Sequence, residues 1–133
     1  MNNHLTDVAR TCLEGAESGR MTFPEIVATL MREGFESYAV DFRRSSATYY
    51  LPDGDSVALE THRHAAPIAS RLDTDAIRAA IRDAQQLVEG YTYSGFCNKV
   101  MTAGCAGYMV SFSGRRALYF GRTTETYVEP FPQ

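Results

Sequence analysis

His62 and His64 are the residues whose type and spacing best fit a metal site. In an extended chain, side chains two positions apart point to the same side, about 7 Å from each other. Two imidazoles could then share one ion, with Glu60 or Asp55 as a third ligand. The alternative interpretation is a pair of solvated residues on an exposed connector. Because nothing in the sequence requires a third ligand, we expect no metal and no other cofactor.

The cysteines Cys12, Cys97 and Cys105 could act as nucleophiles or redox groups. None belongs to a C-x-x-C motif, and no histidine lies near Cys97 or Cys105 in the sequence to activate the thiol. Cys105 follows the predicted end of a helix and has small neighbours, so a ligand could approach it, and we keep it as a candidate binding residue. The alternative for all three cysteines is a small buried side chain in the core.

Two pairs of arginines fall at the turns of two predicted hairpins, Arg43-Arg44 and Arg115-Arg116. If the two turns come together, the guanidinium groups form an anion-binding site suited to phosphate or carboxylate. Arg44 and Arg116 would then orient a substrate, and Asp41, Cys105 or a tyrosine would transfer the proton. The alternative is that the turns are solvated and lie at opposite ends of the molecule.

Tyrosines are the third candidate set, because the chain has eight of them and no tryptophan. Five fall on predicted strands: Tyr49, Tyr50, Tyr108, Tyr119 and Tyr127. A sheet face lined with tyrosines can bind a small planar ligand or a protein, since the ring packs while the hydroxyl stays polar. We take Tyr49 and Tyr119 as the ligand-binding candidates. The alternative is that the rings form cross-strand pairs that stabilise the sheet.

Composition and motifs exclude several classes of protein. The chain has 133 residues, of which 44% are hydrophobic and 22% charged, as in an ordinary globular protein. A net charge of −3 gives no field for wrapping nucleic acid, and no apolar run approaches the roughly 20 residues of a membrane-spanning helix. No G-x-S-x-G, Walker, G-x-G-x-x-G or H-E-x-x-H motif is present. The odd number of cysteines and the lack of a secretory signal lead us to expect a cytoplasmic protein, monomeric or homodimeric, with no membrane or nucleic-acid partner.

Periodicity predicts two helices and a three-stranded meander in the first half of the chain. An apolar stripe marks a helix over about residues 3–18, ended by Gly19. The run Thr22-Phe23-Pro24-Glu25 has the spacing of a capping box, and the second helix that it begins ends at Gly34. Three strands follow, at residues 38–43, 47–51 and 56–60.

A linker over about residues 61–72 separates this unit from a second one with the same order of elements. Asp73 caps a third helix, whose apolar stripe runs on to Leu87 and Val88 before Gly90 ends it. The remaining predicted elements are a helix at 92–103 and three strands, at 108–113, 116–120 and 124–128.

The two units also resemble each other directly in sequence. Residues 92–120 align without a gap on residues 22–50, with eight identical pairs that include Gly34/Gly104 and Tyr38/Tyr108. We therefore predict a single α+β domain over residues 1–133, formed by internal duplication of an α-α-β-β-β unit, with repeat halves at about 3–60 and 73–129. Antiparallel meanders would pack against helices across a pseudo-twofold axis. The sequence leaves open whether the strands make one sheet or two, and which strands meet.

Three stretches resemble the closing signature of the YdfO-like family: A-G-C-A-G-Y-M-V, S-G-R-R-A-L-Y-F-G-R-T and V-E-P-F-P. F-P-E-I-V-A-T-L and T-Y-Y-L-P-D-G in the first half match that family as well, so the resemblance covers about residues 13–132. The family is a bacterial domain of unknown function, with some members encoded in prophages. The resemblance implies a compact α+β domain and no particular activity.

Two functions fit these observations. The first is a non-enzymatic accessory module that binds a protein partner or a small ligand at a tyrosine-rich sheet face. The second is a small enzyme that acts on an anionic substrate held by the hairpin arginines. The lack of a catalytic motif favours the first and leaves enzymatic activity open. A specific function is expected where the two units differ, as at Asp41/Ser111 and Phe35/Cys105.

Overall fold

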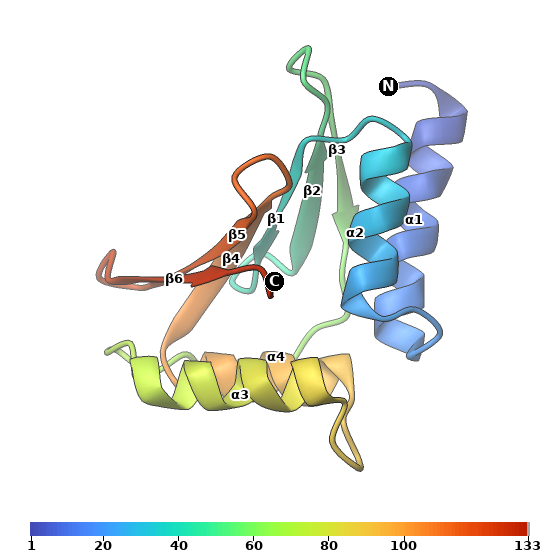
Figure 1. Ribbon diagram of the computed structural model, residues 1–133. Helices are drawn as coiled ribbons and strands as arrows, with labels where there is room; N and C mark the ends of the chain where they lie inside the picture. The colour runs from blue at the N-terminus through green and yellow to red at the C-terminus, as the bar shows by residue number, and fades with distance from the viewer. Residues whose placement is uncertain (133) are drawn as a thin grey trace.

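The computed structural model describes residues 1–132, which form an α+β fold of four helices and six strands (Figure 1). The helices are α1 (Asn3–Ser18), α2 (Phe23–Arg32), α3 (Thr74–Gln86) and α4 (Tyr93–Thr102). The strands are β1 (Ser37–Asp41), β2 (Ser46–Tyr50), β3 (Ser56–Glu60), β4 (Cys105–Ser111), β5 (Arg116–Gly121) and β6 (Thr126–Pro130). The fold class and the order of elements agree with the sequence prediction.

Local sequence accounts for where most helices begin and end. Thr22 and Glu25 form the predicted capping box of α2, in which each side chain accepts a hydrogen bond from the backbone N–H of the other residue. α3 ends at Gln86, before the predicted Gly90, because Leu87 takes the left-handed conformation and donates to the carbonyl of Ala84. The extension of the apolar stripe to Leu87 was therefore wrong, and this side chain is exposed.

All six strands form one antiparallel sheet in the order β3-β2-β1-β4-β5-β6. The sequence left open whether the strands form one sheet or two, and the structure has one. The two meanders join through β1 and β4, where Ser37 pairs with Ser111 and Asp41 with Gly107. Because β1 and β4 are antiparallel, the β1–β2 turn and the β4–β5 turn lie at opposite ends of the sheet.

The last strand was predicted to begin at residue 124, but it begins at Thr126. The backbone N–H of Gly121 donates to the carbonyl of Glu125, and Thr124, with φ of 67°, donates back to the carbonyl of Gly121. These two bonds close a turn that uses the residues assigned to the start of the strand. The turn shifts the strand by two positions.

Both helix pairs pack on the same face of the sheet and leave the other face uncovered (Figure 1). Alternate strand residues point toward the helices and form the core: Tyr38, Val40, Ala47, Tyr49, Tyr108, Val110, Ala117 and Tyr119. They meet fully buried helix residues such as Leu30, Ile77 and Val100. A sheet covered on one side explains the alternation seen in the sequence.

The linker is closely packed where it enters the second half. Ala69 and Asp73 donate backbone hydrogen bonds to the carbonyls of Met101 and Ala103, at 3.3 and 2.7 Å. Gly104 permits this approach, because its φ is 95° and a Cβ at this position would collide with the carbonyl of Arg71. In residues 1–132, every helix is too short or too polar to span a lipid bilayer.

Candidate functional site

The tyrosines predicted to bind a ligand lie in the core. Tyr49 and Tyr119 face the helices and are 3% and 6% exposed. Tyr49 stacks on Tyr38 with ring centroids 5.4 Å apart, and Tyr119 lies 5.3 Å from Tyr108. Burial raises the pKa of both phenols, so they stay neutral at ordinary pH. These contacts are the cross-strand aromatic pairs of the alternative interpretation, and they leave neither ring open to a ligand.

Arg44 and Arg116 do not share a site. Arg116 is level with Ser37, whereas Arg44 lies in the turn beyond Asp41, so about six residues of extended chain at about 3.3 Å each separate them, farther than two arginine side chains span. Asp41 has a structural role, because its Oδ1 accepts the backbone N–H groups of Arg43 and Arg44 at 2.9 and 3.2 Å. The convergence that an anion-binding enzyme site requires is not observed.

The thiols are buried and unactivated. Cys105 is fully buried, and its Sγ donates to the carbonyl of Gly107 at 3.1 Å. Burial raises the pKa of Cys12 and Cys105 to about 11 and that of Cys97 to about 12. A thiol must ionise to act as a nucleophile, so these cysteines behave as small core residues.

His62 and His64 attach the linker to two helices. Glu17 on α1 accepts the backbone N–H of His62 at 2.7 Å, and its other oxygen lies 3.4 Å from the ring Nε2. His64 Nδ1 lies 3.4 Å from Ser94 Oγ on α4, and burial lowers the pKa of His64. Asp55, one of the expected third ligands, instead pairs with the N-terminal amine at 2.7 Å. Among residues 1–132, no three or more His, Cys, Asp or Glu side chains are arranged to hold a metal ion.

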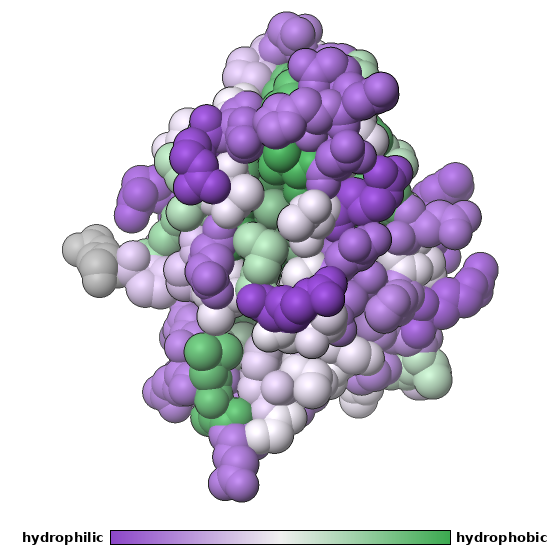
Figure 2. All heavy atoms as spheres, turned by 90° about the vertical axis from the view of Figure 1, so that its right-hand side faces the viewer, coloured by the Kyte–Doolittle hydropathy of each residue, from purple (hydrophilic) through white to green (hydrophobic). Residues whose placement is uncertain are grey.

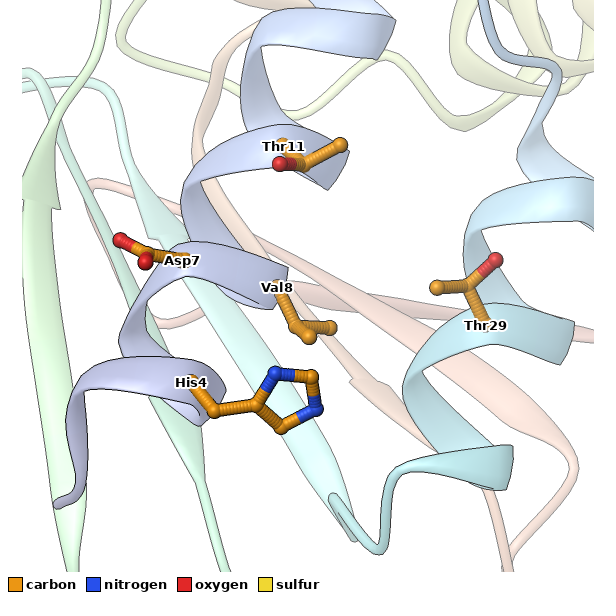
Figure 3. Close-up of a pocket in the computed structure, with 5 residues that line it drawn as sticks. All are labelled: His4, Asp7, Val8, Thr11 and Thr29. Atoms are coloured by element: carbon orange, nitrogen blue, oxygen red, sulfur yellow. The ribbon is translucent and has the colours of Figure 1, made fainter.

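Shallow grooves lie between the paired helices, on the side away from the sheet. One, of about 250 Å³, is lined by four residues of α1 and one of α2: His4, Asp7, Val8, Thr11 and Thr29. Figure 2, which looks onto the right-hand side of Figure 1, shows a surface that is largely hydrophilic with apolar side chains in a central strip. In Figure 3 the labelled side chains do not converge, and Asp7 points away from Thr29. The groove brings no nucleophile together with an activating base.

The uncovered face of the sheet carries a row of side chains across its middle that are apolar except for one threonine. The apolar row, from edge to edge, consists of Ala58, Thr48, Ala39, Met109, Leu118 and Val128. Met109 and Val128 are 46% and 41% exposed, and none of the six residues belongs to the hydrophobic core. The neighbouring rows are mainly polar and include Asp41, Glu60 and Arg116.

Phe120 extends this apolar surface on β5. It pairs with Gly107 on β4, where a Cβ would collide with the phenyl ring. The ring therefore lies over the glycine, on the same side of the sheet as Met109, and a glycine is needed beneath it. The β4–β6 half of the uncovered face is consequently the more apolar half.

A protein-family model described as "Protein of unknown function (DUF1398)" matches residues 9–130. The chain belongs to the DUF1398 family. No curated protein matches it with significant similarity. The match confirms the resemblance to a domain of unknown function, while the YdfO-like name stays a prediction. The description of the family names no activity, so a function for this chain must be argued from its own surface.

The reactive residue types in the sequence do not point to two features of this DUF1398 domain. Glu17 lies 45 positions before His62 in the chain, too far for spacing to connect them. The apolar row contains no reactive side chain at all. A signal for it was nevertheless present, because Met109, Leu118 and Val128 occupy the outward positions of their predicted strands, where polar residues are usual.

Proposed function

We propose that this DUF1398 domain is a protein-binding module whose contact surface is the uncovered face of the sheet. The observation that carries this proposal is the apolar row, with Met109 at its centre and Val128 at its edge both exposed by more than two fifths. A continuous apolar surface bordered by polar residues is typical of a protein contact. A small ligand is less well supported, because small ligands bind in concave sites and this surface is a sheet face.

We also propose that the two halves arose by duplication and are related by a pseudo-twofold axis between Ala39 and Met109. Two backbone hydrogen bonds support the pseudo-twofold axis, because adding 70 to the residue numbers of one half gives the equivalent residues of the other half. Phe42 donates to the carbonyl of Ala106, and Phe112 donates to the carbonyl of Glu36. The turn residues Ser45 and Arg115 share a φ of 52°. On this basis residues 61–72 link two related units within one domain.

The proposed duplication separates positions needed for folding from positions free to change. On the four central strands, β1, β2, β4 and β5, four helix-facing pairs are identical: Tyr38/Tyr108, Val40/Val110, Ala47/Ala117 and Tyr49/Tyr119. Residues of the apolar row differ in all three pairs: Ala39/Met109, Thr48/Leu118 and Ala58/Val128. Each change makes the second half larger and more apolar on the surface. A core role does not explain this, since these side chains point away from the core.

The alternative, an enzyme for an anionic substrate, has less support. It requires Arg44, Arg116 and a proton-transfer group to meet, and the two arginines belong to turns at opposite ends of the sheet. Burial also keeps the candidate thiols protonated. The three free cysteines fit a reducing compartment, so we propose a cytoplasmic location for the module.

Photo-crosslinking tests the binding function. A photoreactive amino acid is placed at position 109 of the full chain, and in a second protein at position 31, because Met31 on α2 is equally exposed (49%) but lies outside the sheet. After irradiation in the cells that express it, we expect position 109 to form a crosslinked product with one protein chain of defined mass. Position 31 should not form that product. Equal labelling from both positions, or none from either, would overturn the proposal.

A further inference from the structure

We infer that the uncovered sheet face binds a second copy of this chain, in a face-to-face dimer whose twofold axis runs parallel to the strands. This inference rests on the proposed binding function of that face and names its partner. It starts from an asymmetry in the apolar row. The three members on β1, β2 and β3 are small, namely Ala39, Thr48 and Ala58. The three on β4, β5 and β6 are large, namely Met109, Leu118 and Val128.

A twofold rotation parallel to the strands brings these unequal halves together. Packed sheets lie about 10 Å apart with their strands within about 30° of each other. The rotation places β4 opposite β1 of the second copy, β5 opposite β2 and β6 opposite β3. Each large residue then lies over a small one: Met109 over Ala39, Leu118 over Thr48 and Val128 over Ala58. Facing layers reach dense packing when large and small residues alternate in this way.

A twofold axis perpendicular to the strands fits the surface poorly. It would set each member of the apolar row opposite itself in the second copy. Met109 would meet Met109 and Leu118 would meet Leu118, while Ala39 would face Ala39 across an unfilled gap. Overpacking in one half and a void in the other both cost stability. The size pattern therefore selects the axis parallel to the strands.

The rows beside the apolar row are compatible with the same arrangement. Phe120 would lie opposite Ser46, which again sets a large side chain over a small one. Arg116 would lie opposite Tyr50, close enough for a cation–π contact. Asp41 would face Gly107 of the second copy and the Phe120 ring that lies over it, so this carboxylate meets no like charge.

The size of the face suits a reversible dimer. Six strands about 4.8 Å apart and five residues of about 3.3 Å each give a face of roughly 29 by 16 Å. Two copies would bury about 900 Å² before the relief of the side chains is counted, which is below the roughly 1,200–2,000 Å² of stable interfaces and typical of a weak, transient contact. We therefore expect association to depend on concentration in the micromolar range.

Sedimentation velocity of the full chain, from roughly 1 to 300 μM, tests for the dimer. We expect a shift from monomer to dimer in the wild-type protein. Met109→Asp should weaken association at least about tenfold, because it places an unpaired carboxylate in the interface. Met31→Asp is the matched control and should leave association unchanged. A wild-type protein that stays monomeric over this range, or equal effects of the two variants, would overturn the inference.

Thiol crosslinking tests the axis with single-cysteine additions on the outer strands. A bis-maleimide of about 10 Å span, matched to the distance between packed sheets, is added to Ala58→Cys, to Val128→Cys and to their mixture. The native cysteines are buried and serve as the unreactive background. We expect a crosslinked dimer from the mixture and from neither variant alone. Crosslinking of Val128→Cys with itself would overturn the parallel axis.

The sedimentation and photo-crosslinking results together separate the dimer from the binding function. A monomeric protein whose position 109 still captures a different protein would overturn the self-association alone. The absence of any capture would overturn the binding function as well.

Discussion

Ala39 and Met109 lie directly opposite each other on β1 and β4, at the centre of the sheet, and both point away from the helices. The residues that flank them and face the helices are the same on both strands, with Tyr38 matching Tyr108 and Val40 matching Val110. The difference between alanine and methionine therefore alters the surface and leaves the core unchanged. This is the position at which a function of the uncovered face is most sharply testable.

Gly104 should tolerate substitution less well than Gly34. Both glycines have positive φ, of 95° and 94°, so alanine at either site costs about 1 kcal/mol in backbone strain. At Gly104 the added Cβ also collides with the carbonyl of Arg71, whereas Gly34 has open space around it. We expect Gly104→Ala to lower the free energy of unfolding by about 3 kcal/mol, measured by urea denaturation. Equal losses for the two variants would mean that the linker does not pack against Gly104.

Glu17 should stabilise the protein through the backbone of the linker. Its side chain is 9% exposed and accepts the N–H of His62 at 2.7 Å, while the imidazole of His62 is largely exposed. Glu17→Ala should cost about 1–2 kcal/mol of unfolding free energy, and His62→Ala less than about 0.5 kcal/mol. Glu14→Ala, at an exposed position on the same helix, is the control. If His62→Ala proves as costly as Glu17→Ala, the ion pair matters more than the backbone contact.

Stability should fall in alkaline solution. Burial raises the pKa of Cys12 and Cys105 to about 11 and that of Cys97 to about 12, from an ordinary value near 9. Above pH 9 the thiols ionise in the unfolded chain but stay protonated in the folded one. Ionisation therefore stabilises the unfolded chain, and the free energy of unfolding falls as the pH rises toward 11–12. Buried tyrosines such as Tyr119 act in the same direction. We expect constant stability from about pH 7 to 8.5 and a progressive loss above pH 9.

Urea denaturation at a series of pH values measures this loss. Each group contributes up to about 1.4 kcal/mol per pH unit in the interval between its unfolded and folded pKa. Replacing Cys97 by alanine should remove part of the slope, because one titrating group is lost. An unfolding free energy that stays flat up to pH 10.5 would show that these groups are not buried as described.

The hydroxyls of Tyr93 and Tyr108 are 2.6 Å apart and connect α4 to the sheet. Tyr93→Phe leaves the hydroxyl of Tyr108 without this partner in a buried setting, so we expect a loss of about 1–2 kcal/mol in unfolding free energy. Tyr50→Phe, on the uncovered face, is the control and should change stability by less than about 0.5 kcal/mol. A loss for Tyr50→Phe as large as that for Tyr93→Phe would argue against this hydrogen bond.

The helices, most of the strands and the fold class were predictable, because they follow from periodicity and capping within short stretches. The capping box at Thr22 and the glycine stop at Gly19 are local signals of this kind. The end of α3 was not predictable, since Leu87 adopts a left-handed conformation that leucine rarely takes. The pairing of β1 with β4 joins residues about 70 positions apart, and local pattern carries no information on such a contact.

The candidate site was harder to predict than the fold. The sequence directed attention to tyrosines, cysteines and arginines, since these side chains can do chemistry. Burial decides what Tyr49 and Cys105 do, and strand direction decides whether Arg44 and Arg116 meet. Both depend on which face of the sheet the helices cover. The apolar row became visible only when that face was known.

The methyl groups of Met109 and Met31 give the most direct test of the central claim, that the uncovered face is buried against a second copy. The two side chains are almost equally exposed in one chain, at 46% and 49%, so a soluble paramagnetic probe should relax both methyl NMR signals alike in dilute protein. As the concentration rises from roughly 1 to 300 μM, we expect the effect of the probe on Met109 to fall several-fold while that on Met31 stays constant. Equal relaxation of the two methyl signals at every concentration would contradict the account.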